Sequence, residues 1–151
     1  MRHRPSMAHD ENVATMLRIF DAIERRDEGR FLENVDAACE MHWPASLPYG
    51  GSATLSSSHR PTWKDTWDRL QPTAAERAMD PRIVAATDDE VVVLWRQRGL
   101  GPTDERFDQE VLALYRLREG KLQRAQMFYF DTCAVAGFLT RSSTHMARIV
   151  A

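Results

Sequence analysis

Three polar side chains lie in or beside segments with β-strand character, and each has a type that could do chemistry: His42, Arg98 and Asp131. An imidazole such as that of His42 titrates near neutral pH, where a general base works. Burial would raise the pKa of the Asp131 carboxyl group and suit it to proton transfer. Arg98 can bind a carboxylate or enolate oxygen. Together these residues are typical of proton transfer next to a carbonyl group.

Two of these residues also have a structural interpretation. Asp131 precedes Thr-Cys-Ala-Val-Ala, and an Asp before such a segment is an ordinary helix N-cap. His42 and Glu40 share one face of their predicted strand, whereas Met41 and Trp43 share the other. If the first face is inward, Glu40 or His42 would be the base. If the second face is inward, Trp43 lines a wall.

Two arginines, Arg96 and Arg98, share one face of the strand predicted from Val91 to Gly99. Arginines on a face of a central strand need partners. One alternative is an anionic oxygen of a ligand, which would make both residues ligand-binding. The other is an ion pair with Glu110 or with an Asp of the neighbouring strand.

The elements that position these residues centre on the C-terminal part of the chain. Segments rich in Val, Leu, Tyr, Phe and Trp run from Val91 to Gly99, from Phe107 to Arg118 and from Lys121 to Phe130. The short connections around Gly101 and at Glu119-Gly120 are too short to hold crossover helices. We therefore predict an antiparallel meander with one face that needs cover.

The rest of the chain is predicted to supply that cover. Apolar residues at helical spacing predict a helix from Asn12 to Arg26, followed by a short helix that Asp27 caps. We further expect a strand from Ala38 to Trp43 and an irregular loop from Pro44 to Ser58. A helix should follow, capped by Ser57 or Ser58 and with Pro61 in its first turn. Then come a strand over Glu76 to Thr87, interrupted near Asp80, and, after the meander, a short helix from Asp131 through Leu139. Residues 1–10 are predicted to be a flexible extension, residues 11–140 the domain, and residues 141–151 a tail.

Composition limits the class of protein. The chain has 151 residues, of which 43% are hydrophobic and 28% charged, so one soluble domain is expected. The order of the predicted helices and strands gives this domain an α+β layout. The formal net charge of −2 gives no general attraction to nucleic acid or to an anionic membrane. The beginning of the chain lacks the apolar segment of a signal peptide, and we expect a cytoplasmic protein. The two cysteines, Cys39 and Cys133, are expected to be free buried thiols.

The segments HWPASLPYGG and REGKLQRAQMFYFDT, together with the order of helices and strands, resemble the SnoaL-like branch of the NTF2-like superfamily, over about Glu11 to Leu139. The superfamily also contains ketosteroid isomerases, limonene epoxide hydrolases and polyketide cyclases. The resemblance implies a cone in which a curved antiparallel sheet wraps around N-terminal helices and encloses one apolar pocket, often in a homodimer. The motif WRQR, with no Asp two residues later, argues against epoxide hydrolysis.

The resemblance also implies roles for individual residues. Asp131 matches the position of an acid/base carboxylate in some SnoaL-like cyclases, and His42 lies on a strand that skirts the pocket in relatives. Tyr49 would present its hydroxyl group at the mouth. Gln126 and Phe128 lie near positions of polar catalytic groups, where a Phe weakens the enzymatic interpretation. The candidate ligand-binding residues, for which core packing is the alternative, are Trp43, Tyr49, Trp63, Trp67, Arg96, Gln126, Phe128 and Tyr129.

Three functions are consistent with these residues. The first is a cofactor-independent isomerase, cyclase or dehydratase that moves a proton on an apolar polyketide-like or steroid-like molecule. The second is a module that binds such a molecule without changing it, and the third is a dimeric interaction domain. The five histidines show no metal-ligand spacing, and neither a metal nor a cofactor is expected.

Overall fold

The computed structural model describes residues 6–55 and 61–150. Within these residues, six strands form one sheet in the order β2-β1-β6-β5-β4-β3. The strands are β1 (Val35–Trp43), β2 (Gly51–Thr54), β3 (Arg82–Ala86), β4 (Glu90–Leu100), β5 (Arg106–Arg118) and β6 (Lys121–Tyr129). The helices are α1 (Met7–Arg25), α2 (Glu28–Glu33), α3 (Trp63–Trp67), α4 (Ala74–Arg77) and α5 (Thr132–Val150), with a 3-10 turn, η1 (Asp68–Leu70), after α3. The predicted α+β class and curved sheet are confirmed.

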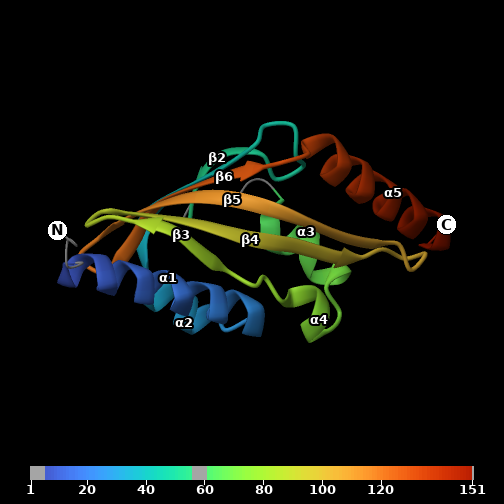
Figure 1. Cartoon of the computed structure of the whole chain (residues 1–151). Helices are drawn as coiled ribbons and strands as arrows, with labels where there is room; N and C mark the ends of the chain where they lie inside the picture. The colour runs from blue at the N-terminus through green and yellow to red at the C-terminus, as the bar shows by residue number, and fades with distance from the viewer. Residues whose placement is uncertain (1–5, 56–60, 151) are drawn as a thin grey trace.

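The long strands β4, β5 and β6 form the predicted antiparallel meander across the middle of the molecule (Figure 1). The turn between β5 and β6 has positive φ angles at Glu119 and Gly120, 52° and 73°, as expected for a tight hairpin whose twist matches its strands. One pairing is not antiparallel: β1 lies parallel to β6. The long chain between β1 and β6 permits this parallel pairing, which a short hairpin would not.

Helices α1 and α2 lie along one side of the sheet, and α5 extends from the end of β6, so that the two termini lie at opposite ends (Figure 1). Helix α1 begins at Met7, five residues before the predicted start, because the Ser6 hydroxyl accepts a hydrogen bond from the backbone N–H of His9 at 3.1 Å. Its buried residues Met16, Ile19 and Phe20 belong to the hydrophobic core. Burial of this apolar stripe holds α1 against the sheet.

The local structure differs from the sequence prediction in three further places. Residues 51–54 pair with β1 as β2, although the segment was expected to be an irregular loop. Helix α3 is capped by Thr62, whose hydroxyl accepts from the N–H of Asp65 at 3.1 Å; the predicted caps, Ser57 and Ser58, lie outside the described residues. A second cap, Thr73 with Glu76, begins the short helix α4 where a strand was predicted.

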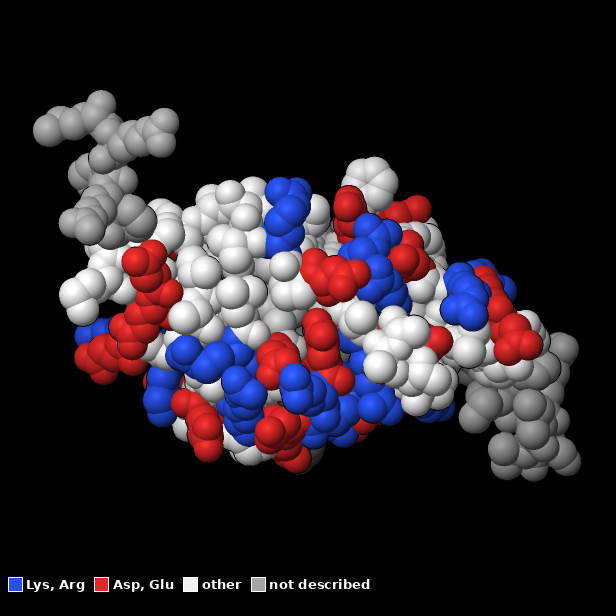
Figure 2. Space-filling model, turned by 60° about the horizontal axis from the view of Figure 1, so that its bottom comes forward, with Lys and Arg blue, Asp and Glu red and all other residues white. Residues whose placement is uncertain are grey.

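Helix α5 continues to Val150, beyond the predicted end near Leu139. No helix in the described part of the chain combines the length and apolar character that a membrane crossing requires. On the face that carries α1 and α2, positive and negative side chains are interspersed (Figure 2).

Both cysteines are free. Cys39 is buried as predicted. The prediction for Cys133 is wrong, because this side chain is exposed in the first turn of α5.

Candidate ligand pocket

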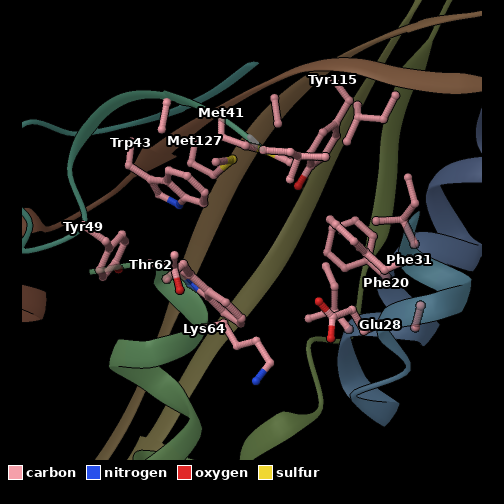
Figure 3. A pocket seen from close by; sticks show the side chains of 18 of the residues that line it. Phe20, Glu28, Phe31, Met41, Trp43, Tyr49, Thr62, Lys64, Tyr115 and Met127 are labelled. Carbon is pink, nitrogen blue, oxygen red and sulfur yellow. The ribbon is translucent and has the colours of Figure 1, made fainter. Parts of the chain in front are cut away.

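A cavity of about 390 Å³ lies between the inner face of the sheet and the helices α1, α2 and α3. Figure 3 shows its side chains: Met41, Trp43 and Met127 on one side, Phe20 and Phe31 on the other, and Tyr115 between them. Most of the residues that line it are apolar or aromatic. The inner wall is formed by Ile19, Phe20, Ile23, Phe31, Met41, Trp43, Tyr49, Trp63, Met79, Trp95, Tyr115, Leu122, Ala125 and Met127.

The strands form the floor of this cavity because alternate residues of each strand face inward. On β4 the buried residue at the cavity is Trp95, and on β5 it is Tyr115. Ala125 on β6 stands opposite Tyr115 in the strand register. The methyl group of Ala125 fills less space than a larger apolar side chain would, which leaves room beside the Tyr115 ring.

Aromatic packing on α1 forms one wall. The Phe20 ring lies 6.0 Å from the Tyr115 ring, nearly perpendicular at 88°, and 6.3 Å from the Trp95 ring. Edge-to-face contacts of this kind stabilise aromatic pairs beyond the burial of area. These contacts hold the Phe20 ring in place as the aromatic part of this wall.

Helix α3 forms another wall and is tied to the sheet by a side-chain hydrogen bond. The Trp63 indole Nε1 donates to the Gln97 Oε1 at 2.8 Å. Gln97 lies on the inner face of β4 and is only 1% exposed. A buried amide needs its hydrogen bonds satisfied, so this contact fixes the Trp63 ring at the cavity.

Tyr49 lies at the edge of the cavity, but its hydroxyl group is turned into the protein. The hydroxyl accepts a hydrogen bond from Trp67 Nε1 at 3.1 Å and lies 3.0 Å from the hydroxyl oxygen of Tyr129. Burial raises the pKa of Tyr49 to about 12 and raises the pKa of Tyr129 well above its ordinary range. The hydroxyl is therefore a structural group, and the expectation that it lies at the mouth is wrong.

The mouth of the cavity carries the charges. Glu28 on α2 and Lys64 on α3 lie on opposite sides of it (Figure 3). The Lys64 Nζ lies 2.6 Å from Asp68 Oδ2, and the Nε of Arg26, which also lines the cavity, lies 2.9 Å from Asp68 Oδ1. Both cations are thus paired with the same carboxylate, outside the apolar interior.

Comparison with known proteins agrees with this geometry. A family model described as the SnoaL-like domain matches residues 16–125, which is more than half of the chain. The chain belongs to the SnoaL-like family. Among curated proteins, none has a significant sequence match to it.

Solved structures similar to this SnoaL-like chain share its fold at low sequence identity. A protein from a Jannaschia species, named as a SnoaL-like polyketide cyclase, is 18% identical with a TM-score of 0.68, over 91% of this chain and 97% of that one. An NTF2-like protein from Burkholderia pseudomallei is 20% identical with a TM-score of 0.65, over 86% and 98%. TerC, co-crystallised with polyporic acid, is 16% identical with a TM-score of 0.64, over 86% and 98%.

The structure of this SnoaL-like chain places the predicted proton carriers outside the cavity. The Asp131 carboxylate is exposed and accepts a hydrogen bond from the backbone N–H of Ala134 at 2.9 Å, which is the N-cap alternative. The His42 ring lies 2.7 Å from Ser52 Oγ and 3.2 Å from Glu40 Oε2. Its strand turns Met41 and Trp43 inward instead.

The two arginines of β4 lie on the outer face of the sheet and have carboxylate partners. The Arg96 Nε lies 2.6 Å from Asp108 Oδ1, and the Arg98 Nη1 lies 2.7 Å from Asp80 Oδ2. Arg98 Nη1 also donates to the backbone oxygen of Ala78 at 2.8 Å. The ion-pair alternative therefore describes both residues.

The other predicted ligand-binding residues divide into three groups in the SnoaL-like fold. Trp43, Tyr49 and Trp63 line the cavity. Trp67 and Tyr129 are buried in the core beside it. Gln126 and Phe128 lie on the outer face of β6, where Phe128 is 49% exposed.

Phe20, Trp95 and Tyr115 are among the pocket residues that were not predicted from the sequence. A signal for Tyr115 was present, because Val111, Ala113 and Tyr115 alternate with polar residues and form the inward face of β5.

Proposed function

We propose that this SnoaL-like chain binds a flat, apolar small molecule in the cavity beneath the sheet. The observation that carries the proposal is a cavity of about 390 Å³ with a largely apolar and aromatic wall. This volume falls within the range of roughly 300–1,000 Å³ that is usual for small-molecule sites. TerC, a protein of the same fold, was co-crystallised with polyporic acid, which supports a ligand for this pocket.

The alternative is catalysis by an isomerase, cyclase or dehydratase of the polyketide-cyclase type. The position of the carboxylates favours binding. Among the described residues that line the cavity, the acidic groups are Asp27 and Glu28, both exposed at the mouth. Neither Asp131 nor His42 is among these lining residues. We therefore assign proton transfer to neither Asp131 nor His42.

Replacing Ala125 with Phe tests the proposed pocket. The new ring would occupy the space beside Tyr115, and we expect affinity for flat ketones and steroids to fall by at least about tenfold, a loss of about 1.4 kcal/mol. Tryptophan quenching and native mass spectrometry would measure binding. Ala85→Phe, on the exposed part of edge strand β3, is the matched control and should leave affinity unchanged.

Two further variants separate binding from the predicted catalytic residues. Asp131→Asn and His42→Ala should leave the affinity of every bound compound unchanged, because neither residue is among those that line the cavity. A folded Ala125→Phe variant that binds as tightly as the wild type would contradict the proposed pocket.

We also propose that two copies of the chain associate through the outer face of the sheet. Leu94, Leu112 and Phe128 are neighbours across β4, β5 and β6 in the strand register, and Leu112 and Phe128 are 40% and 49% exposed. The ion pair of Arg96 and Asp108 flanks this apolar patch, so both signs of charge are present for a self-complementary contact.

Phe128→Asp tests the proposed dimer, because a carboxylate in an apolar interface would remain unpaired and costly. We expect sedimentation velocity to show a dimer for the wild type and a monomer for the variant. Val84→Asp, an equally exposed apolar position at 48% on edge strand β3, is the control and should remain dimeric. A monomeric wild type, or a dimeric Phe128→Asp variant, would rule out this interface.

A further inference from the structure

The hydroxyl group of Tyr115 points from the central strand β5 into the cavity (Figure 3). The residue is only 7% exposed. The hydroxyl has a side-chain hydrogen bond with the Trp95 indole and, because an indole N–H only donates, the hydroxyl oxygen is the acceptor. Its own proton has no acceptor among the hydrogen bonds of the described residues, and a buried donor at a cavity wall indicates an acceptor that comes from outside the chain.

The other two tyrosines of the chain do not share this property. The hydroxyl groups of Tyr49 and Tyr129 lie 3.0 Å apart and share one hydrogen bond, and Tyr49 also accepts from Trp67. Both hydroxyl groups bond within the core, whereas the Tyr115 hydroxyl faces the cavity, where a ligand can reach its proton.

The Trp95 indole lies on the neighbouring strand and is buried. The rings of Trp95 and Tyr115 both pack against Phe20 and both line the cavity. The indole can donate to the Tyr115 hydroxyl but cannot accept from it, so the phenolic proton stays available to an acceptor oxygen in the cavity.

The charges around the cavity decide which kind of oxygen fits. Arg26 and Lys64 lie at the mouth and are paired with Asp68, so neither is free to neutralise a charge at the floor. An uncompensated anion beside Tyr115 would lose its hydration without gaining a cation. Burial raises the pKa of Tyr115, so its hydroxyl stays protonated and remains a donor at neutral pH. A neutral carbonyl oxygen satisfies these conditions.

We infer that Tyr115 is the ligand-orienting residue of the pocket, and that its hydroxyl donates a hydrogen bond to the carbonyl oxygen of a flat ketone or quinone. The inference rests on the proposed binding function. The hydrogen bond would set the orientation of the bound molecule. Its carbonyl group lies at the floor of the cavity, beside β5, and its hydrocarbon part contacts the aromatic walls.

A matched pair of probes tests the inference: 9-fluorenone and fluorene, which have the same ring system with and without a carbonyl group. Tyr115→Phe removes only the hydroxyl. We expect this variant to bind 9-fluorenone about tenfold more weakly than the wild type and to bind fluorene with unchanged or higher affinity, as expected for one buried hydrogen bond. The carbonyl stretching band of bound 9-fluorenone should lie at lower frequency in the wild type than in Tyr115→Phe.

Tyr129→Phe is the control, because its hydroxyl bonds to Tyr49 within the core and the residue does not line the cavity, and it should not change the affinity ratio of the two probes. If Tyr115→Phe weakens both probes equally, or neither, the hydroxyl does not recognise the carbonyl and the inference is overturned while the pocket stands. If neither probe binds the wild type at all, both the inference and the proposed function fail.

Discussion

Replacing Trp67 with Ala should lower the free energy of unfolding by about 3–5 kcal/mol, the usual range for removing a fully buried aromatic ring. Trp67 has no exposed surface. Its ring stacks on Phe138 at 6.0 Å and 17° and lies 5.8 Å from the Phe107 ring, so it joins α3 to α5 and β5. Gly99 on β4 gives the ring room, since a Cβ there would lie 2.9 Å from Trp67 Cζ3.

Part of the expected loss in the free energy of unfolding comes from a hydrogen bond. Trp67 Nε1 donates to the Tyr49 hydroxyl, so the alanine variant removes one of the two partners of that buried group. Urea unfolding followed by circular dichroism would measure the change. Trp43→Ala is the control: Trp43 is half-buried at the cavity, and we expect it to lose less than about 2 kcal/mol. Equal losses for the two variants would show that Trp67 is not a centre of the core.

The meander and the amphipathic helix α1 could be predicted because their signals are local. Alternation along β4 and β5, the Glu119-Gly120 turn and the apolar stripe of α1 each determine structure within a few residues. Segment 51–54 gives no such signal. Its strand forms because the edge of β1 supplies hydrogen-bond partners, and this pairing depends on residues that are distant in the sequence.

The candidate site was harder to predict for the same reason. Alternation shows that Met41 and Trp43 face opposite to His42, but the direction of the pocket follows from the pairing of β1 with β6. Likewise, the inward position of Tyr115 is readable from the sequence. That its hydroxyl reaches the cavity depends on the packing of its ring against Phe20 of α1, a residue that is distant in the sequence.

The three tyrosines should make the protein unstable at alkaline pH. Burial raises the pKa of Tyr49 from its ordinary value of 10.0 to about 12 and raises those of Tyr115 and Tyr129 as well. The unfolded chain therefore releases these protons at lower pH than the folded chain does. The contribution of the protonated tyrosines to the free energy of unfolding is fully present below about pH 10 and is lost as the pH rises from there toward 12.

The expected loss is large. Each pKa unit corresponds to about 1.4 kcal/mol, and half of Tyr49 is still protonated in the folded protein at pH 12, so Tyr49 alone lowers the free energy of unfolding by about 2 kcal/mol by that pH. Urea unfolding at pH 8 to 11.5 would measure the slope, and absorbance at 295 nm would report phenolate formation. Tyr49→Phe removes one of the three groups, and its stability should fall less steeply with pH.

The same titration distinguishes the three hydroxyl groups. If all three hydroxyl groups were enclosed in the core, phenolate absorbance would appear only together with unfolding. Tyr115 differs, because its hydroxyl faces the cavity. A bound ketone that accepts a hydrogen bond from this hydroxyl should raise the pH at which Tyr115 ionises, whereas the hydrocarbon should not. Ionisation of one tyrosine near pH 10 in the folded protein, insensitive to 9-fluorenone, would contradict the raised pKa of Tyr115 and its assigned contact with the ligand.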